Sequence, residues 1–151
     1  MRKAVIYWIA MVLFAYTTAF SGTFTDNSDG TITDSSTDLI WQQASTSGKT
    51  WAAALQTCNS LKFPANTTHQ WRLPNVKEAY SIVDFTKVNP AMTDDGKSKF
   101  SEPTKTYWTS TIDPKNAADK RYYLNYGDGT LTSGDKDSGC WVRCVRGGKK
   151  R

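Results

Sequence analysis

The sequence predicts an α+β fold in which two helices pack on short antiparallel sheets joined by long loops. Short extended segments, separated by Asp, Asn, Ser and Gly, occupy the beginning and the end of the chain. The middle of the chain instead shows apolar residues at helical spacing. Strands followed by helices and again by strands are typical of helices packed on an antiparallel sheet.

The N-terminal residues 1–21 have the features of a secretory signal peptide. Arg2 and Lys3 precede an apolar run from Ala4 to Tyr16, and small residues follow the run. The run is shorter than the roughly 20 residues that cross a bilayer. We therefore expect cleavage, export to the periplasm, cell surface or exterior, and no membrane span afterwards. An uncleaved signal anchor is the alternative.

After cleavage we expect one domain, residues 22–146, and a basic tail, residues 147–151. The mature length of about 130 residues is typical of a single domain. Removal of Arg2 and Lys3 leaves 17 of the 19 basic residues against 14 acidic ones, a net charge of +3. The tail supplies three positive charges, so the domain is nearly neutral. Nucleic acid, which needs a clustered basic face, is not an expected partner.

Three short strands are predicted at the start of the domain: Phe24 to Asp26, Thr31 to Asp34 and Leu39 to Gln42. The sequences Asn-Ser-Asp-Gly and Ser-Ser-Thr-Asp separate them, and both are rich in residues that form turns. Gly30 can adopt the positive φ that a tight hairpin needs. We expect a β-hairpin followed by a return strand.

The same segment has some features of a calcium loop, because Asp26, Asp29 and Asp34 surround Gly30. An EF-hand loop, however, ends in a glutamate at its twelfth position. The first glutamate of this sequence is Glu78. The turn interpretation is therefore favoured, and we expect neither a metal nor another cofactor.

The first helix is predicted to begin at Trp51, and Thr50 can cap its start. Ala54, Leu55 and Cys58 continue the helical spacing. A Phe-Pro pair then closes the segment.

The second helix is predicted to begin after Asn75, which can form a capping box with Glu78. Its apolar residues lie on one face: Val76, Ala79, Tyr80 and Val83. Residues 84–105 are polar and interrupted by Pro and Gly, so we expect a long irregular connection.

The chain then returns to strands, which are predicted at Thr106 to Ile112, Arg121 to Tyr126, Thr130 to Ser133 and Cys140 to Arg146. Gly-Asp-Gly joins the second and third of these as a hairpin.

The tryptophans are expected to be structural. Trp71 and Arg72 directly precede the second helix. An indole buries a large apolar area, and a partly buried guanidinium needs a carboxylate or carbonyl groups. Trp51 and Trp108 are likewise expected in the core.

Three cysteines in an exported chain leave one unpaired. Cys140 and Cys144 are four residues apart in a predicted strand, which places their Cα atoms about 13 Å apart. A disulfide requires less than roughly 7 Å. These two cysteines therefore do not pair with each other, and Cys58 can pair with either of them.

No catalytic arrangement is evident, and we do not expect an enzyme. The single histidine, His69, lies in a polar loop, and no His, Cys and carboxylate group has the spacing of a zinc site. The adjacent Asp94 and Asp95 are expected to be solvated.

Five sequence motifs in order, at the spacing of one domain, resemble a known family. They are DGTITDSSTDLIW (29–41), W-x3-L-x2-C-N-x-L (51–61), WRLPNVKE (71–78), YWTST (107–111) and VRCVR (142–146). Together they resemble the Lcl C-terminal-like domain family of exported bacterial proteins, over nearly the whole mature chain.

The resemblance implies a C-type-lectin-like fold, distantly similar to that of formylglycine-generating enzymes. Those enzymes bring two cysteines together on copper, whereas Cys140 and Cys144 are too far apart for this. The motif around Cys144 implies that it pairs with Cys58. Cys140 is then either a buried small apolar residue, a thiol for an intermolecular disulfide or a redox thiol.

In lectin-like folds the late loops form the recognition face, here roughly residues 94–105, 113–122 and 127–139. Their cations can donate charge-assisted hydrogen bonds to sulfate or carboxylate groups, although many aspartates share these loops. The candidate ligand-binding residues are Lys115, Lys120, Arg121, Tyr123 and Lys136.

Our first hypothesis is a secreted, non-enzymatic binding domain with adhesin-like recognition of a glycan or sulfated polysaccharide, as described for an adhesin of the family. The alternative is an assembly module that docks to an envelope protein through its aromatic surface or Cys140. Lysines converging on one face favour the first hypothesis, and an exposed apolar patch favours the second.

Overall fold

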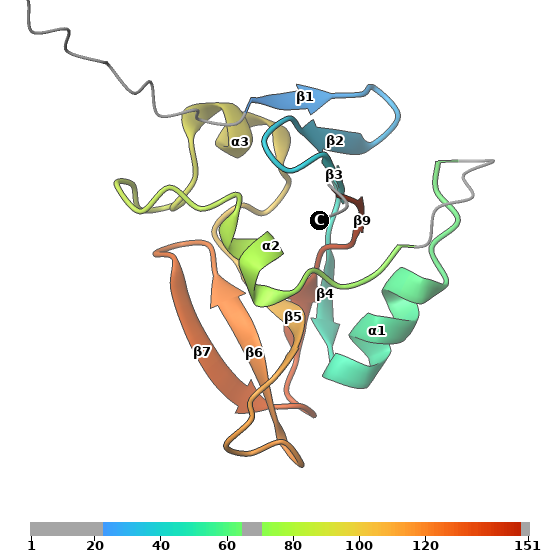
Figure 1. Ribbon diagram of the computed structural model, residues 1–151, viewed down its shortest axis with the longest axis vertical. Coiled ribbons are helices and arrows are strands. Elements are labelled where there is room, and N and C mark those ends of the chain that lie inside the picture. Colours follow the sequence, from blue (N-terminus) through green and yellow to red (C-terminus); the bar gives the residue numbers. More distant parts are fainter. Residues whose placement is uncertain (1–22, 65–70, 149–151) are drawn as a thin grey trace, which may run out of the picture.

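The computed structural model describes residues 23–64 and 71–148 (Figure 1). The predicted signal peptide, His69 and the last three residues of the predicted tail lie outside these ranges. Within them the chain forms two sheets and three short helices. The elements are β1 (Phe24–Asp26), β2 (Thr31–Asp34), β3 (Leu39–Gln42), β4 (Thr46–Lys49), α1 (Trp51–Asn59), α2 (Val76–Tyr80), α3 (Asp94–Lys99), β5 (Thr106–Ile112), β6 (Lys120–Asn125), β7 (Thr130–Asp135), β8 (Cys140–Val142) and β9 (Val145–Gly147).

The predicted α+β class is confirmed. One sheet has the strand order β1-β2-β3-β9, and the other has the order β4-β8-β5-β6-β7. Helix α2 packs on β5 and β6, whereas α1 packs on β4, β5 and β8 (Figure 1). The pairing of β5 with β8, at Tyr107 and Trp141, is parallel. The expected antiparallel pairing does not hold at this one place, because the sequence shows which segments are extended but not which strands become neighbours.

The opening hairpin is confirmed, and its aspartates form turns. Asp29 Oδ1 accepts hydrogen bonds from the Thr31 N–H, at 3.0 Å, and from the Thr31 hydroxyl, at 2.6 Å. Asp34 accepts in the same way from Ser36. Gly30 has a φ of 79°, and a Cβ there would collide with the Phe63 ring. Only glycine satisfies both constraints.

Both predicted helix caps are present. Thr50 accepts from the Ala53 N–H at the start of α1. Asn75 and Glu78 form the capping box of α2. This helix ends at Tyr80, so Val83 lies beyond it rather than on its face.

Two elements were not predicted. Helix α3 lies in the segment expected to be irregular, and the Thr93 hydroxyl caps it at the Gly96 N–H. Glycine lowers helix propensity, but here it admits Phe24, whose Cε2 would be 3.2 Å from a Cβ at position 96. The other element is β4, whose sequence Thr-Ser-Gly-Lys shows no apolar alternation.

The predicted strand from Cys140 to Arg146 is in fact two strands in different sheets. Strand β8 ends at Val142, and β9 begins at Val145, so the chain crosses between the sheets at Arg143 and Cys144. Strand β9 includes Gly147, which had been assigned to the tail. Apolar residues occur on both sides of Arg143 with no turn residue between them, so the sequence pattern did not reveal the break.

The disulfide implied by the family resemblance is confirmed. Cys58 on α1 and Cys144 at the crossing are bonded, and their Cα atoms are 5.5 Å apart. The bridge spans 86 residues, which corresponds to about 4 to 5 kcal/mol in the chain-entropy description of disulfides. It ties α1 to the point where the chain changes sheets.

Two apolar clusters fill the interior. One contains Trp41 and lies between α2, β1–β3 and the start of β5; the other contains Trp71, Trp108 and the disulfide. Trp71 and Trp108 are buried, as predicted. Trp51 is half-buried, and its indole N–H donates to the Thr109 carbonyl at 2.8 Å.

Arg143, at the crossing, is a fully buried arginine with 1% exposure. Its guanidinium donates to the carbonyls of Gln42, at 3.1 Å, and Gln43, at 2.7 Å. It also donates to the Ser101 carbonyl and to the Tyr107 hydroxyl, the latter at 3.0 Å. These acceptors come from the β3–β4 connection, the segment after α3, and β5. One side chain therefore joins three separate parts of the chain.

We predict that Arg143→Met and Arg143→Lys will each lower the free energy of unfolding by about 3 kcal/mol or more. Methionine removes all four hydrogen bonds that the guanidinium donates, and lysine cannot reproduce the planar array of N–H groups. Denaturant unfolding measures the change.

Lys97→Met on α3 is the control, because Lys97 is exposed and should alter stability by no more than about 0.5 kcal/mol. An Arg143→Met protein as stable as this control would contradict the role assigned to Arg143.

Candidate functional site

The five predicted ligand-binding residues lie on or beside β6, but they do not share one role. Lys115 is in the β5–β6 loop, Lys120, Arg121 and Tyr123 are on β6, and Lys136 directly follows β7. Lys120 lies opposite Asp135 in the β6–β7 register, which brings the loops after β5 and β7 together. We call residues 113–120 and 135–139 the loop-end surface; the two loops lie at the lower end of the sheet in Figure 1.

Hydrogen bonds hold the loop-end surface in shape. Asp113 is buried and accepts from the Lys115 N–H at 3.0 Å. A hydrogen bond from the Ser133 hydroxyl lowers the pKa of Asp113, so this carboxyl is ionised at neutral pH. Lys136 Nζ donates to the Ala118 carbonyl at 2.9 Å and to Asp119 at 3.2 Å. The two loops therefore form one connected surface.

Arg121, which was predicted to bind a ligand, is a buried residue. It is 8% exposed, and its Cζ lies 4.4 Å from the centroid of the Trp51 ring. Its guanidinium donates to the carbonyls of Ala117, at 2.9 Å, and Lys120, at 2.8 Å. Arg121 thus supports the loop from inside and joins β6 to α1. The sequence placed it among cations but did not show which face of β6 it occupies.

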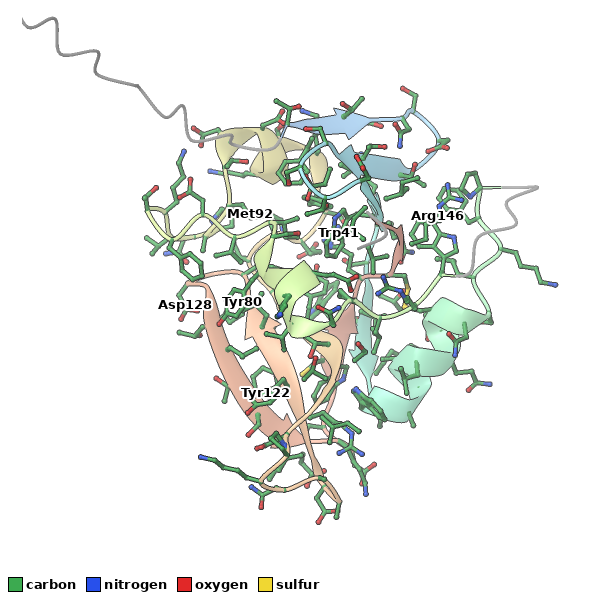
Figure 2. The ribbon with its side chains drawn as sticks, viewed as in Figure 1. Trp41, Tyr80, Met92, Tyr122, Asp128 and Arg146 are labelled. Atoms are coloured by element: carbon green, nitrogen blue, oxygen red, sulfur yellow. A yellow bond between two sulfur atoms is a disulfide. The ribbon has the colours of Figure 1, made fainter. Side chains whose placement is uncertain are left out.

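Tyr123, another predicted ligand-binding residue, packs against the buried Trp108. Its ring is 5.7 Å from that of Trp108 at an angle of 76°, an edge-to-face contact. A Cβ at Gly134 would collide with the Tyr123 ring. Because side chains alternate along a strand, Tyr122 projects to the opposite face of β6, and Figure 2 labels it near the lower end of the sheet.

Lys115 and Lys120 remain as the accessible cations of the loop-end surface. Lys136 is engaged with Asp119. Neither Lys115, which is exposed, nor Lys120, which is half-buried, forms an ion pair with any residue in the described ranges. Their ammonium groups are the ones on this surface that can meet an external anion.

A second polar site, not predicted from the sequence, lies between the β2–β3 turn and α2. This α2 pocket has a volume of about 470 Å³. Its lining residues are Ser36, Thr37, Leu39, Asn75, Lys77, Glu78, Ser81 and Gly148. They come from three distant segments, so only the capping residues Asn75 and Glu78 gave any local signal of special geometry.

One side of the α2 pocket is fixed by an ion pair. Arg72 Nη1 and Nη2 donate to the two oxygens of Glu78 at 2.7 Å each. This confirms the expectation that Arg72 needs a carboxylate. Burial alone would raise the pKa of Glu78, but hydrogen bonds from Arg72 and the Asn75 N–H hold it below its usual value. Glu78 is therefore an ionised, already neutralised group.

Cys140 and the possible metal ligands complete the description of the titratable groups in the described ranges. Burial raises the pKa of the half-buried Cys140 thiol to about 11, so it is protonated at neutral pH and a poor nucleophile. Among residues 23–64 and 71–148, no group of three His, Cys, Asp or Glu side chains could hold a metal ion. No helix in the described part of the chain is long and apolar enough to cross a membrane.

These features define a small disulfide-bonded α+β domain with two polar surface sites on a rigid double-sheet frame. The Lcl C-terminal domain family matches residues 30–146. The chain therefore belongs to this family, as the sequence motifs indicated. A comparison with curated proteins finds no match.

We predict that Glu78→Gln will make stability less dependent on pH in the acid range. The folded-state pKa of Glu78 lies below its usual value of 4.5. Its contribution to stability is thus present above pH 4.5 and is lost as pH falls through the folded-state pKa. The wild-type protein should be more stable than the variant by about 1 kcal/mol at pH 7, since the pair is partly exposed. This difference should shrink toward zero in acid.

Glu102→Gln is the matched control, because Glu102 is 3.9 Å from its partner Lys105 and both are largely exposed. Urea unfolding at a series of pH values tests the prediction. A wild-type advantage over Glu78→Gln that stays constant down to the lowest pH would contradict it.

Proposed function

We propose that this protein is an exported, non-enzymatic binding domain that recognises an anionic polysaccharide through the loop-end surface. The observation that carries the proposal is the pair Lys115 and Lys120, two cations on one hydrogen-bonded surface that form no ion pair within the described ranges. We further propose that its double-sheet fold is C-type-lectin-like and that recognition is adhesin-like.

The chemistry of these lysines supports the proposal. An ammonium group donates charge-assisted hydrogen bonds to sulfate or carboxylate oxygens. The Asp113 and Lys136 contacts already order both loops, so the protein would lose less conformational entropy when a ligand binds. Arg121 contributes indirectly, because its bond to the Ala117 carbonyl supports the loop between the two lysines.

The test is binding of the purified protein to sulfated, carboxylated and neutral polysaccharides at low and high salt. We expect retention on at least one anionic polymer, weaker at high salt because exposed charges are screened. The double variant Lys115→Ala with Lys120→Ala should weaken binding about tenfold or more, equivalent to about 1.4 kcal/mol.

A control with the same loss of charge is Lys87→Ala with Lys97→Ala, because Lys97 lies on α3 and Lys87 pairs with Asp94 of that helix, away from the loop-end surface (Figure 1). It should bind like the wild type. Equal losses of binding in the two double variants would mean that net charge alone governs retention. If no polymer retained the wild-type protein, the glycan proposal would be wrong.

A second candidate function, docking to an envelope protein, is favoured by an exposed apolar loop. Phe85 is 71% exposed and Val88 is 69% exposed. Their loop is held to the β6–β7 hairpin by a hydrogen bond from the Asn89 N–H to the Gly127 carbonyl at 2.6 Å.

Two ionised aspartates, Asp84 and Asp128, flank this apolar loop. Hydrogen bonds from Thr86 and Thr130 lower their pKa values. The ring of Tyr80, which Figure 2 labels, is 5.6 Å from that of Phe85.

The partner that fits this loop is a protein with an apolar groove bordered by Lys or Arg. A photo-crosslinking residue at position 85 should capture such a protein in cells, and the same residue at position 97 should not. The captured protein, once purified, should bind Phe85→Ser with Val88→Ser about tenfold more weakly than wild type. Unchanged binding would exclude this docking mode.

A further inference from the structure

The α2 pocket has the size and composition of a site for a small polar ligand. Its volume of about 470 Å³ falls within the range of roughly 300 to 1,000 Å³ typical of ligand sites. Three lining residues carry hydroxyl groups, one carries an amide and one an ammonium group. Leu39, which is 3% exposed, provides an apolar side chain. This combination suits a ligand with several hydroxyl groups and an apolar C–H face.

The hydroxyl groups of the pocket are available chiefly as acceptors. Thr37 Oγ1 donates to Asp34 Oδ2 at 2.6 Å, and Ser81 Oγ donates to the Glu78 carbonyl at 2.8 Å. Each hydroxyl has a single proton, so these oxygens can only accept a hydrogen bond from a ligand. The hydroxyl groups of a sugar ring are suitable donors.

Two other groups offer donors and a positive charge. Asn75 Oδ1 accepts from the Glu78 N–H at 2.9 Å, so its NH₂ is the side that remains for a ligand. Lys77 is exposed and forms no ion pair with the described residues. The charge of Glu78 is balanced by Arg72. Lys77 is therefore a lining cation without an ion pair in the described ranges, and an anionic group of a ligand can lie beside it.

The pocket is also preorganised. The capping box fixes Asn75 and Glu78 relative to each other. The buried Asp34 fixes the opposite side through its bonds to the Ser36 and Thr37 hydroxyls. Groups held by such internal contacts lose little entropy when a ligand binds.

We propose that the α2 pocket binds a single sugar residue that carries one anionic group, with ring hydroxyls donating to Thr37 and Ser81 and the anionic group beside Lys77. The inference deepens the proposed function and rests on it for the ligand class, since acidic sugars are units of anionic polysaccharides. It assigns a recognition site separate from the loop-end surface.

Nitrogen-15 NMR titrations of the protein with glucuronate, glucose 6-phosphate, glucose and acetate test the proposal. Either or both acidic sugars should shift the amide signals of residues 36–39 and 75–81, with a Kd of about 1 mM. Glucose and acetate should bind about tenfold more weakly, because each lacks one half of the ligand. The two acidic sugars distinguish a carboxylate from a phosphate group. Equal binding of acetate or glucose and the acidic sugars would overturn the proposal.

Two variants examine the two halves of the site. Lys77→Met should reduce acidic-sugar binding to the level of glucose, and Ser81→Ala should weaken glucose and the acidic sugars together. Lys97→Met, at another exposed lysine, should bind as the wild type does. Unchanged acidic-sugar binding by Lys77→Met would overturn the proposal.

The variant Lys115→Ala with Lys120→Ala separates this inference from the proposed function. It should retain acidic-sugar binding at the α2 pocket even where it loses the polymer. Polymer binding by a protein whose pocket signals do not respond to acidic sugars would overturn the pocket assignment and leave the loop-end proposal standing. Acidic-sugar binding at the α2 pocket by a protein that no anionic polymer retains would overturn the loop-end proposal and leave the pocket assignment standing.

Discussion

The arrangement of the two sheets depends on a buried guanidinium. Arg143 has no carboxylate partner among the described residues; carbonyl dipoles and a hydroxyl stabilise its charge instead. The rings of Phe100 and Tyr107 lie 4.7 and 5.0 Å from its Cζ, close enough for cation–π attraction. A buried charge without such partners costs several kcal/mol. The acceptors must therefore remain in place, and they fix where the chain crosses from β8 to β9.

The disulfide and this guanidinium act at the same place for different reasons. Cys144 follows Arg143 directly, so α1 is tied covalently to the crossing. The disulfide restricts mainly the unfolded chain, whereas the Arg143 hydrogen bonds distinguish the native packing from other compact arrangements. Together they provide a frame for the rest of the chain. The loop after α2 adds the buried Ile82 and Met92 to the core, whereas the loops after β5 and β7 extend from the frame with mostly exposed residues. Polar residues there can serve recognition.

The sequence predicted the elements that depend on local patterns. The bounds of β1, β2, β3 and β5 agree with the prediction, because turn residues and apolar alternation mark them. The capping box of α2 is equally local. Helix α3 was missed although Thr93, Asp94 and Asp95 are local start signals, because the Gly96 inside it lowers helix propensity. The break at Arg143 was missed because it depends on distant partners, the Gln42 and Gln43 carbonyls. The α2 pocket was missed for the same reason, since it exists only where separate segments meet.

The candidate binding surface was only partly predictable, because arginine and lysine play different parts here. Arg121, Arg143 and Arg146 are buried, and each lies over an aromatic ring: Trp51 for Arg121, Phe100 for Arg143 and Trp71 for Arg146. A planar, weakly hydrated guanidinium tolerates such sites, whereas a strongly hydrated ammonium group stays in water.

The charge balance of the described ranges follows from this division. Five of the 19 basic residues lie outside these ranges, which leaves 14 against 14 acidic residues. Three arginines are buried, whereas the buried acidic residues of these ranges are two, Asp34 and Asp113. Burial therefore removes more positive than negative charge from the surface. The described surface thus has no excess of cations to attract polyanions from a distance. The proposed recognition of an anion must instead depend on short-range contacts at particular lysines. Lys77, Lys115 and Lys120 form no ion pair in the described ranges and stand where neighbouring groups are already ordered.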